Sequence, residues 1–362
     1  MLSNHADFLA STRDQRVVSK QTLLNEATKN NYFFFSTMMK RAEQKFKGGD
    51  KLVDRIQGDV AGTFSFYNPN DEFAPTQQDT LKSISVDWAF AQSHYVLIKE
   101  TASLNSGDPI AYLDYVMSLE QGCVVDTING LEEALWAKPD SRTMESSSAD
   151  PINPLSLLCF NTRDGLAPSS TNGGIATGSS DWTTLQGLSP SNEAWYRNKF
   201  KSYTAATPDN PDAGLISAMD DIVLQTKFEL PDAMNKYGES ESLQKHCITT
   251  SRDGIVFYKA RLRALNDRME QLRDPNINGV QYNGVPLVYV SELDGLGWTD
   301  NQPDYMFWDF NYIVPFFHSD TYMDETISTG GSRQPNSTVV FKFTWYNMIN
   351  RSRRRQGRLF AA

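Results

Sequence analysis

The spacing of hydrophobic residues predicts four helices, the longest of which lies in the first half of the chain. Apolar residues recur every three to four positions in residues 21–46, 108–138, 212–226 and 252–272. The second segment opens at Asp108-Pro109, where Asp can cap backbone N–H groups and Pro fits the first turn, and it stops before Pro139. At ~1.5 Å per residue such a helix is roughly 43 Å long. We expect it to cross the whole molecule.

Alternation of apolar and polar residues predicts strands elsewhere. Residues 51–69 and 83–100 are rich in β-forming residues and are joined by the polar segment 70–80. Together they predict a two-stranded hairpin of about forty residues, which is marginal in water alone and is expected to rest on another subunit. Further strands are expected in 282–290, 304–317 and 337–350, with Phe341, Phe343 and Trp345 on one face of the last and Lys342, Thr344 and Tyr346 on the other. This order gives an α+β fold class without an internal repeat.

Composition is that of a folded soluble chain. Hydrophobic residues make up 40% of 362 residues, which can fill a sizeable core. No stretch reaches the length of a membrane span, and the amino end lacks the apolar region of a secretion signal, so no membrane partner is expected. The three cysteines are widely spaced and form no CxxC pair, which indicates free thiols in a reducing compartment.

Charge separates the two ends of the chain from its body. Residues 1–47 hold eight Lys/Arg and four Asp/Glu, and residues 351–362 hold five Arg and no acid. The remaining 303 residues carry 21 basic against 40 acidic side chains, although the whole chain has a net charge of −10. Basic ends of one copy can therefore pair with the acidic body of another.

Motifs that would indicate catalysis or metal binding are weak. The four histidines include no pair at the spacing of a helical zinc site, and no GxSxG nucleophile elbow occurs. His246 and Cys247 are adjacent, which on a strand favours a buried thiol beside a surface imidazole. Residues 274–285 open like a calcium loop but place Val285 where a bidentate Glu is required, so a polar turn is expected. We predict no enzymatic activity and no cofactor.

Four acids lie close together in the sequence, at positions 294, 300, 304 and 309. A solvated loop rim explains them as well as a site does, because Asp is usually exposed unless it is paired. Residues 140–190, rich in Ser, Thr, Gly, Asn and Pro, are expected to be mostly irregular surface around the apolar run 155–160.

The order of these segments resembles the major capsid proteins of tailed bacteriophages with the Hong Kong 97-type fold. The resemblance covers most of the chain and is supported by the stretches WYRNKF, NGVPLVYV, DYMFWDFNYIVPFF and SRRRQG. It implies an α+β capsid fold divided into an N-terminal arm, an E-loop hairpin, a spine helix with the peripheral domain, an axial domain, and a return to the peripheral domain with the C-terminal segment. The corresponding ranges are 1–47, 48–107, 108–190, 191–300 and 301–362.

Such a resemblance implies a structural protein that assembles into an icosahedral shell of pentamers and hexamers in the virion, after assembly in the host bacterial cytoplasm. The shell would enclose double-stranded DNA without sequence specificity. Because Met1 lies close to the hairpin, scaffolding is expected from a separate protein or from none, and decoration and portal proteins are further possible partners. Lys51 and Lys82 are the hairpin lysines, but no catalytic carboxylate accompanies them and cross-linking is not expected.

Assembly candidates follow from charge. Lys51, Asp54, Arg55 and Asp59 supply both signs along one edge of the hairpin, which would suit contact with a neighbouring copy. We expect each hairpin to lie over a neighbour, so that many weak contacts repeated around rings hold the shell.

The arginine run RSRRRQGRLF at residues 351–360 supplies the other candidates, Arg353, Arg354 and Arg355. If the last strand continues, Arg353 and Arg355 point to one face and Arg354 to the other, which is unlike the one-sided stripe of a groove binder. Pairing with acids of a neighbouring copy is the favoured interpretation. Contact with packaged DNA and a solvated end are the alternatives.

Three other classes of function stay open. A tail tube or connector protein is one, although tube subunits are shorter and mostly β-structured. An encapsulin-like compartment shell has the same fold and encloses proteins. A cytosolic enzyme is the third, because an enzyme of this size need not show a local motif.

Overall fold

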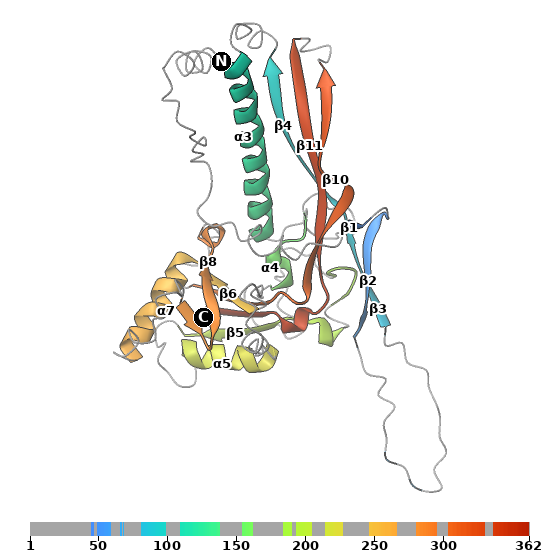
Figure 1. Cartoon of the computed structure of the whole chain (residues 1–362). Coiled ribbons are helices and arrows are strands. Elements are labelled where there is room, and N and C mark those ends of the chain that lie inside the picture. The colour runs from blue at the N-terminus through green and yellow to red at the C-terminus, as the bar shows by residue number, and fades with distance from the viewer. Residues whose placement is uncertain are drawn as a thin grey trace, which may run out of the picture. The chain divides into compact units, whose positions relative to one another are not determined.

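The computed structural model describes most of the elements that the pattern predicts (Figure 1). It describes residues 45–46, 49–58, 66, 68, 81–98, 109–137, 154–161, 184–189, 193–204, 214–226, 246–265, 280–294, 303–329 and 336–361. The helix expected in residues 21–46 lies outside this set, except that Lys45–Phe46 form strand β1. The calcium-like turn at 274–279 and the hairpin tip at 71–80 also lie outside it.

The chain divides into two compact units. The helix unit comprises the described residues of Ala91–Leu131 and Asp320–Thr344. The sheet unit comprises those of Asn31–Phe90, Glu132–Ser319 and Trp345–Ala362. The long elements run through both ranges, and their bounds are α3 Pro109–Trp136, β4 Ala89–Ile98, β10 Ile313–Thr329 and β11 Ser337–Asn350.

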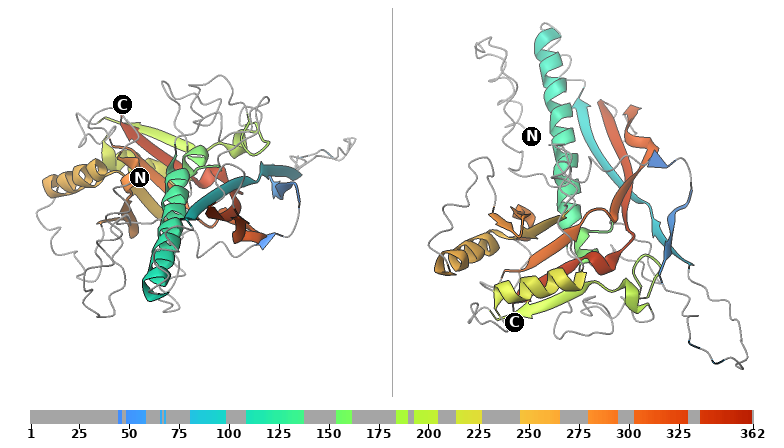
Figure 2. Two further views of the ribbon diagram at one scale, coloured as in Figure 1. Left: turned by 90° about the horizontal axis from the view of Figure 1, so that it is seen from above. Right: turned by 60° about the horizontal axis from the view of Figure 1, so that its bottom comes forward.

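Helix α3 has 28 residues, which confirms the long helix predicted between Asp108 and Pro139. Inside the helix unit, Ser93 of β4 joins the helix through its hydroxyl, which lies 2.7 Å from the Thr127 hydroxyl and accepts from Cys123 Sγ at 3.2 Å. In β11 the rings of Phe341 and Phe343 stack at 6.0 Å, as the alternation predicts. In the helix unit, α3 thus lies along its strands (Figure 2) and is hydrogen-bonded to β4 through Ser93.

Strands form three sheets. A four-stranded sheet has the order β1-β10-β11-β4, a six-stranded sheet has the order β5-β12-β9-β6-β8-β7, and β2 pairs with β3 alone. Strand β12 lies parallel to β5 and antiparallel to β9, so the carboxyl end of the chain is an interior strand. The remaining bounds are β2 Lys51–Gln57, β3 Leu81–Asp87, β5 Lys199–Tyr203, β6 His246–Thr250, β7 Val280–Tyr282, β8 Val285–Tyr289, β9 Tyr305–Asp309 and β12 Gly357–Ala361.

Helices α5 (Leu215–Thr226) and α7 (Arg252–Leu265) confirm the predicted helices at 212–226 and, as far as it is described, at 252–272. The first turn of α7 fits only because residue 254 is glycine, since a Cβ there would collide with the Thr250 side chain. Strands β7 and β8 are joined by Asn283 and Gly284, both with positive φ, which is the turn that Asn-Gly favours.

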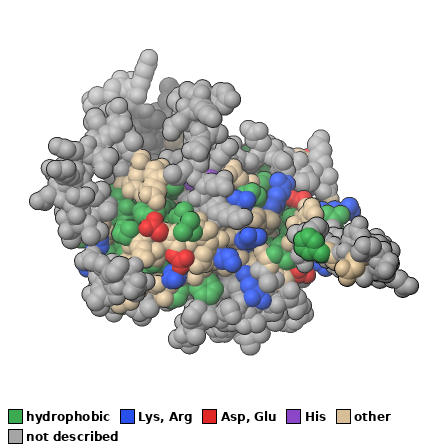
Figure 3. All heavy atoms as spheres, turned by 90° about the horizontal axis from the view of Figure 1, so that it is seen from below, with side chains coloured by type: hydrophobic (Ala, Val, Ile, Leu, Met, Phe, Trp, Pro, Cys, Tyr) green, Lys and Arg blue, Asp and Glu red, His purple; other side chains and the backbone are tan. Residues whose placement is uncertain are grey.

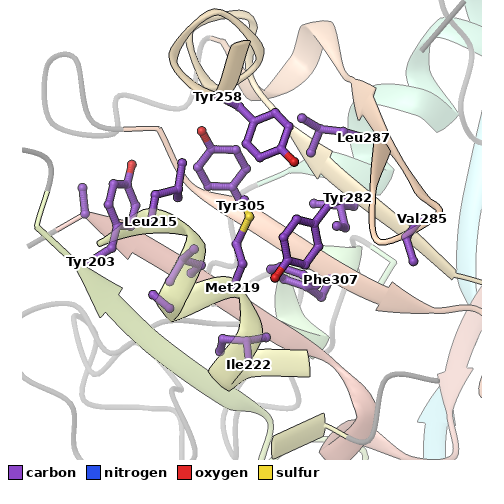
Figure 4. Packing of buried hydrophobic residues seen from close by; sticks show 14 residues of the cluster. Tyr203, Leu215, Met219, Ile222, Tyr258, Tyr282, Val285, Leu287, Tyr305 and Phe307 are labelled. Atoms are coloured by element: carbon purple, nitrogen blue, oxygen red, sulfur yellow. The ribbon is translucent and has the colours of Figure 1, made fainter. Parts of the chain in front are cut away.

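The core of the sheet unit is rich in tyrosine (Figure 4). Tyr203 and Tyr305 lie beside Met219 of α5, and their hydroxyls donate to backbone carbonyls of Pro303 at 2.7 Å and Gly254 at 2.9 Å. Burial raises the pKa of both phenols, so both stay neutral and serve as hydrogen-bond donors. This core therefore buries large rings without leaving their hydroxyls unsatisfied.

Two expectations about strands are wrong in detail. Among the described residues of the expected hairpin, Lys51–Gln57 pair with Leu81–Asp87, whereas Ala89–Ile98 form β4 and pair with β11 instead. The segment 304–317 is two strands, β9 and the start of β10, in different sheets. The α+β class itself is confirmed. Among the described residues, no helix is long and apolar enough to cross a membrane.

Candidate assembly surfaces

The β2–β3 hairpin stem has one buried and one exposed face. Its register pairs Leu52 with Val86 and Asp54 with Ile84, and the apolar residues of these pairs are buried. Successive side chains of a strand alternate between faces, so Val53 points to the opposite side. Val53 and Leu81 are each 59% exposed on that side.

The buried face is fixed to the stem's own chain. Arg351 Nε donates to Asp54 Oδ2 at 2.6 Å, and the backbone N–H of Ser85 donates to the Gln186 carbonyl at 3.1 Å. A Cβ at Gly58 would collide with the Trp195 ring, so this position requires glycine. The stem therefore packs within the sheet unit of its own chain, and contact of the hairpin with another subunit stays a prediction.

The hairpin candidates do not share one surface. Lys51 and Arg55 belong to the exposed face, where Lys51 Nζ lies 2.9 Å from Asp87 Oδ1 across the strand pair. Asp54 lies on the opposite face with Arg351. Strand alternation thus places Lys51 and Arg55 on one face of β2 and Asp54 on the other, and the role of these residues in assembly stays a prediction. Asp59 lies outside the described residues.

The C-terminal arginines do not continue the strand. Arg353–Arg355 form a short 3₁₀ turn, η6, between β11 and β12, so the expected extended conformation is wrong. Arg354 is exposed and Arg355 is half-buried, with its guanidinium 5.1 Å from the centre of the Tyr312 ring. Arg353 is fully buried. The side chain of Arg353 is therefore engaged within its own chain and is not presented to a neighbour.

Arg353 connects three segments of the sheet unit. Its Nε donates to the carbonyl of Phe160 at 3.0 Å, and its Nη2 donates to Asn198 Oδ1 at 2.9 Å. The guanidinium also lies 6.0 Å from the centre of the Tyr196 ring. Burial lowers the pKa of Arg353 to about 10, so it stays protonated at neutral pH. Residues 154–161, expected near irregular surface, are mostly buried here.

Arg358 forms a buried ion pair that the sequence did not indicate. Its Nε and Nη2 both donate to Asp304 Oδ2, at 3.0 and 2.7 Å, and both side chains are 3% exposed. Arg358 Nη1 donates to the Asn161 carbonyl at 3.1 Å. The interpretation of Asp304 as part of a solvated loop rim is wrong, and it is also wrong for Asp309, which is buried.

His246 is not a surface imidazole either. It is buried, with Nε2 3.6 Å from Asp309 Oδ2, while the adjacent Cys247 is a buried free thiol as expected. Among the described residues, no three His, Cys, Asp or Glu side chains are grouped as metal ligands. Arg353, Arg358, Asp304 and Asp309 thus make contacts inside the sheet unit.

Comparison with known proteins gives a likeness of fold. No protein-family model matches the chain, and no curated protein sequence matches it. The capsid of cyanophage A-1(L) is similar with a TM-score of 0.59 and 11% identity, covering 97% of this chain and 98% of that one. The capsid of the native GTA particle gives 0.53 and 9%, covering 97% and 98%. The holo-SrpI encapsulin of Synechococcus elongatus PCC 7942 gives 0.51 and 9%, covering 97% and 94%.

The chain therefore has the fold of capsid and encapsulin shell subunits over nearly its whole length. The resemblance to phage major capsid proteins is confirmed at the level of the fold. Sequence identities of about one residue in ten explain why only the order of segments, and no motif, carries that resemblance.

Proposed function

We propose that this chain is the major capsid protein of a tailed bacteriophage, which assembles into an icosahedral shell around double-stranded DNA. The supporting observation is the likeness to the cyanophage A-1(L) capsid over 97% of the chain. Its role is structural rather than catalytic, and its place is the virion, after assembly in the bacterial cytoplasm. Copies of itself in pentamers and hexamers are its main partners, with scaffolding, decoration and portal proteins as further ones.

The domain assignment is part of this proposal. Residues 1–47 are the N-terminal arm, 48–107 the E-loop, 108–190 the spine helix and part of the peripheral domain, 191–300 the axial domain, and 301–362 the return to the peripheral domain. Helix α3 supports the spine assignment because it is the longest described helix. Strands β10 and β11 support the return, because β10 pairs with β1 and β11 pairs with β4, both from the early part of the chain.

Assembly in this proposal uses the exposed face of the hairpin stem. One face of the stem is held by its own sheet unit through Asp54 and Arg351. The other presents Val53 and Leu81 to solvent, and contact with a neighbouring copy would remove their apolar surface from water. A weak contact of this kind, repeated around symmetric rings, gives a stable shell without a large affinity between any two copies.

The test compares two matched double variants by electron microscopy of the purified protein. Val53→Glu/Leu81→Glu charges the hairpin face, whereas Val256→Glu/Leu224→Glu charges α7 and α5 at valine and leucine positions that are 60% and 77% exposed. We expect wild type and the helix variant to form closed shells and the hairpin variant to stop at small oligomers. Intact shells from the hairpin variant, or loss of shells in both, would make the hairpin assignment wrong.

A wild-type protein that gives only discrete small oligomers would contradict the shell function as a whole. An encapsulin-like compartment is the second candidate, because the SrpI encapsulin shares the fold at a TM-score of 0.51. The contents of shells purified from the native source distinguish a phage capsid from such a compartment. Nuclease-protected double-stranded DNA supports the phage assignment, and enclosed protein cargo without DNA supports the compartment.

A further inference from the structure

Two segments far apart in the sequence place basic side chains on one surface of the sheet unit. Strands β5 and β12 run parallel, with Lys199 in register with Gly357 and the Lys199 N–H donating to the Gln356 carbonyl at 3.1 Å. The η6 turn therefore lies next to the residues that lead into β5. The five residues that this juxtaposition brings together, which we call the basic surface, are Arg197, Lys199, Lys201, Arg354 and Arg355.

The basic surface is accessible and positive. Arg354 is exposed and the other four are partly exposed. An acid accompanies it, Asp221 of α5, whose Oδ2 lies 2.7 Å from Lys201 Nζ. Viewed from the side on which α5 lies, Lys and Arg side chains gather near the middle of the face with few acids among them (Figure 3). A positive field at this point stands out in a chain with a net charge of −10.

The backbone under these side chains is fixed by buried contacts. Arg353 and Arg358, on either side of Arg354 and Arg355, are both buried with hydrogen bonds to other segments. Strand β5 pairs with β12 over all five of its residues. Cations held on a rigid backbone lose less conformational freedom when they bind a charged partner than cations on a mobile tail do.

Composition favours a polyanion over a protein as the partner. Lysine is depleted in protein–protein interfaces, whereas aromatic residues, Met and Arg are enriched there, so the two lysines and the lack of exposed aromatic residues in the described part of this surface favour a polyanion. Among the described residues, none of the exposed large hydrophobic side chains lies on β5, η6 or β12. Clustered Lys and Arg side chains are the feature that binds a phosphate backbone, because neutralising phosphates releases counterions.

We propose that the basic surface binds the phosphate backbone of double-stranded DNA without reading its sequence, and therefore faces the interior of the shell. This inference rests on the proposed function and adds to it the face that meets the packaged genome. An acidic surface of a second copy is the competing partner, and the experiment separates the two.

The experiment measures binding of a fluorescent DNA duplex to the full-length, unassembled protein as salt is raised. Lys199→Gln/Arg354→Gln removes two charges from the basic surface, and Arg252→Gln/Lys259→Gln removes one Lys and one Arg from the exposed side of α7. Each lost phosphate contact lowers the slope of log affinity against log salt by about 0.9. We expect this slope to be smaller by about 1.8 for Lys199→Gln/Arg354→Gln than for wild type. The control Arg252→Gln/Lys259→Gln should have the same slope as wild type. Duplexes of two unrelated sequences should behave alike.

Shell formation by each protein is scored separately by electron microscopy. DNA affinity that is absent in wild type, or unchanged in Lys199→Gln/Arg354→Gln, overturns the proposal. If that variant also stops shells forming while its DNA binding is intact, the surface is a contact between copies. A wild type that binds DNA through this surface but forms no shells would instead overturn the proposed capsid function and leave the basic surface as a DNA-binding one. Circular dichroism confirms that each variant is folded.

Discussion

Two charged clusters of this protein differ in how much water reaches them. In the sheet unit, Arg358 and Asp304 are both 3% exposed and are joined by two hydrogen bonds. In the helix unit, the ammonium of Lys342 lies 3.0 Å from Glu120 and 2.8 Å from Glu325. The Lys342 side chain is 7% exposed, but each of its carboxylate partners is 47% exposed. The first cluster is dry, whereas the second keeps its acids in water.

The choice of cation matches this difference. A guanidinium is planar and weakly hydrated and can satisfy its donors on fixed oxygens, so it suits a buried pair. An ammonium on a flexible stem can bury its methylene groups while its charge reaches partly solvated acids. The comparison teaches that charge in the sheet unit specifies one packing arrangement, whereas charge in the helix unit adds a weaker attraction.

The dry pair also fixes the register of the last strand. Arg358 lies on β12, which has β5 on one side and β9 on the other, and Asp304 directly precedes β9. A slip of β12 by one residue would turn Arg358 to the other face and leave Asp304 buried without its cation. This pair therefore contributes more to choosing the register than to the net free energy of folding.

The largest effect is expected when one partner of the dry pair is removed. Arg358→Met leaves the Asp304 carboxylate buried without its cation, which should lower the free energy of unfolding by about 3 to 5 kcal/mol. Urea unfolding followed by the fluorescence of buried Trp308 measures the change. Combining Arg358→Met with Asp304→Leu removes both charges and should restore most of the loss. A single variant as stable as wild type would show that the pair is not buried as described.

A smaller effect is expected from the wet cluster. Lys342→Met should cost about 1 kcal/mol, because water can solvate both glutamates once the ammonium is gone. Burial alone would lower the pKa of Lys342, but hydrogen bonds and the charges of Glu325 and Glu120 raise it overall. The stabilisation is therefore complete below the ordinary lysine pKa of about 10.4 and is lost as pH rises through the raised value.

Alkaline unfolding tests this sign. Above about pH 10 the free energy of unfolding should fall more steeply with pH for wild type than for Lys342→Met. The reason is that the folded wild type holds the Lys342 proton more tightly than the unfolded chain does, and the variant has no such proton. Lys259→Met, at an exposed position of α7, serves as the control for removing a lysine elsewhere. Parallel pH profiles of wild type and Lys342→Met would contradict the assignment.

Local patterns in the sequence predict the helices and strands, but they do not predict the charged clusters. Asp108-Pro109 and the spacing after it predict α3, and alternation predicts β11 from Ser337 to Asn350. Both predictions depend on residues that are only a few positions apart in the sequence. Arg358 and Asp304 are 54 residues apart, and Arg353 and Phe160 are 193 apart. Only the strand order of the six-stranded sheet brings them together.

The hairpin and the arginine run show why local reasoning failed in these places. The break at Trp88 redirects the chain from the β2–β3 pair into β4, and a single buried side chain gives no pattern that marks such a change. In the arginine run, five like charges in ten positions indicate a solvated or binding surface. Two of them are buried instead: Arg358 because β12 is an interior strand of its sheet, and Arg353 because the η6 turn places it against Phe160 and Asn198.

The smallest effect is expected at a fully wet pair, Lys201 and Asp221, whose side chains are 43% and 36% exposed. The hydrogen bond from Lys201 lowers the pKa of Asp221, against a smaller opposing effect of burial. Its stabilisation is thus present above the ordinary Asp pKa of about 3.9 and is lost as pH falls through the lowered value. Lys201→Gln should move the Asp221 titration back toward the ordinary range, as read by NMR of the carboxyl carbon. Stability at neutral pH should change by less than about 1 kcal/mol, because solvent screens the pair. A loss as large as that of Arg358→Met would show that water does not divide these clusters as proposed.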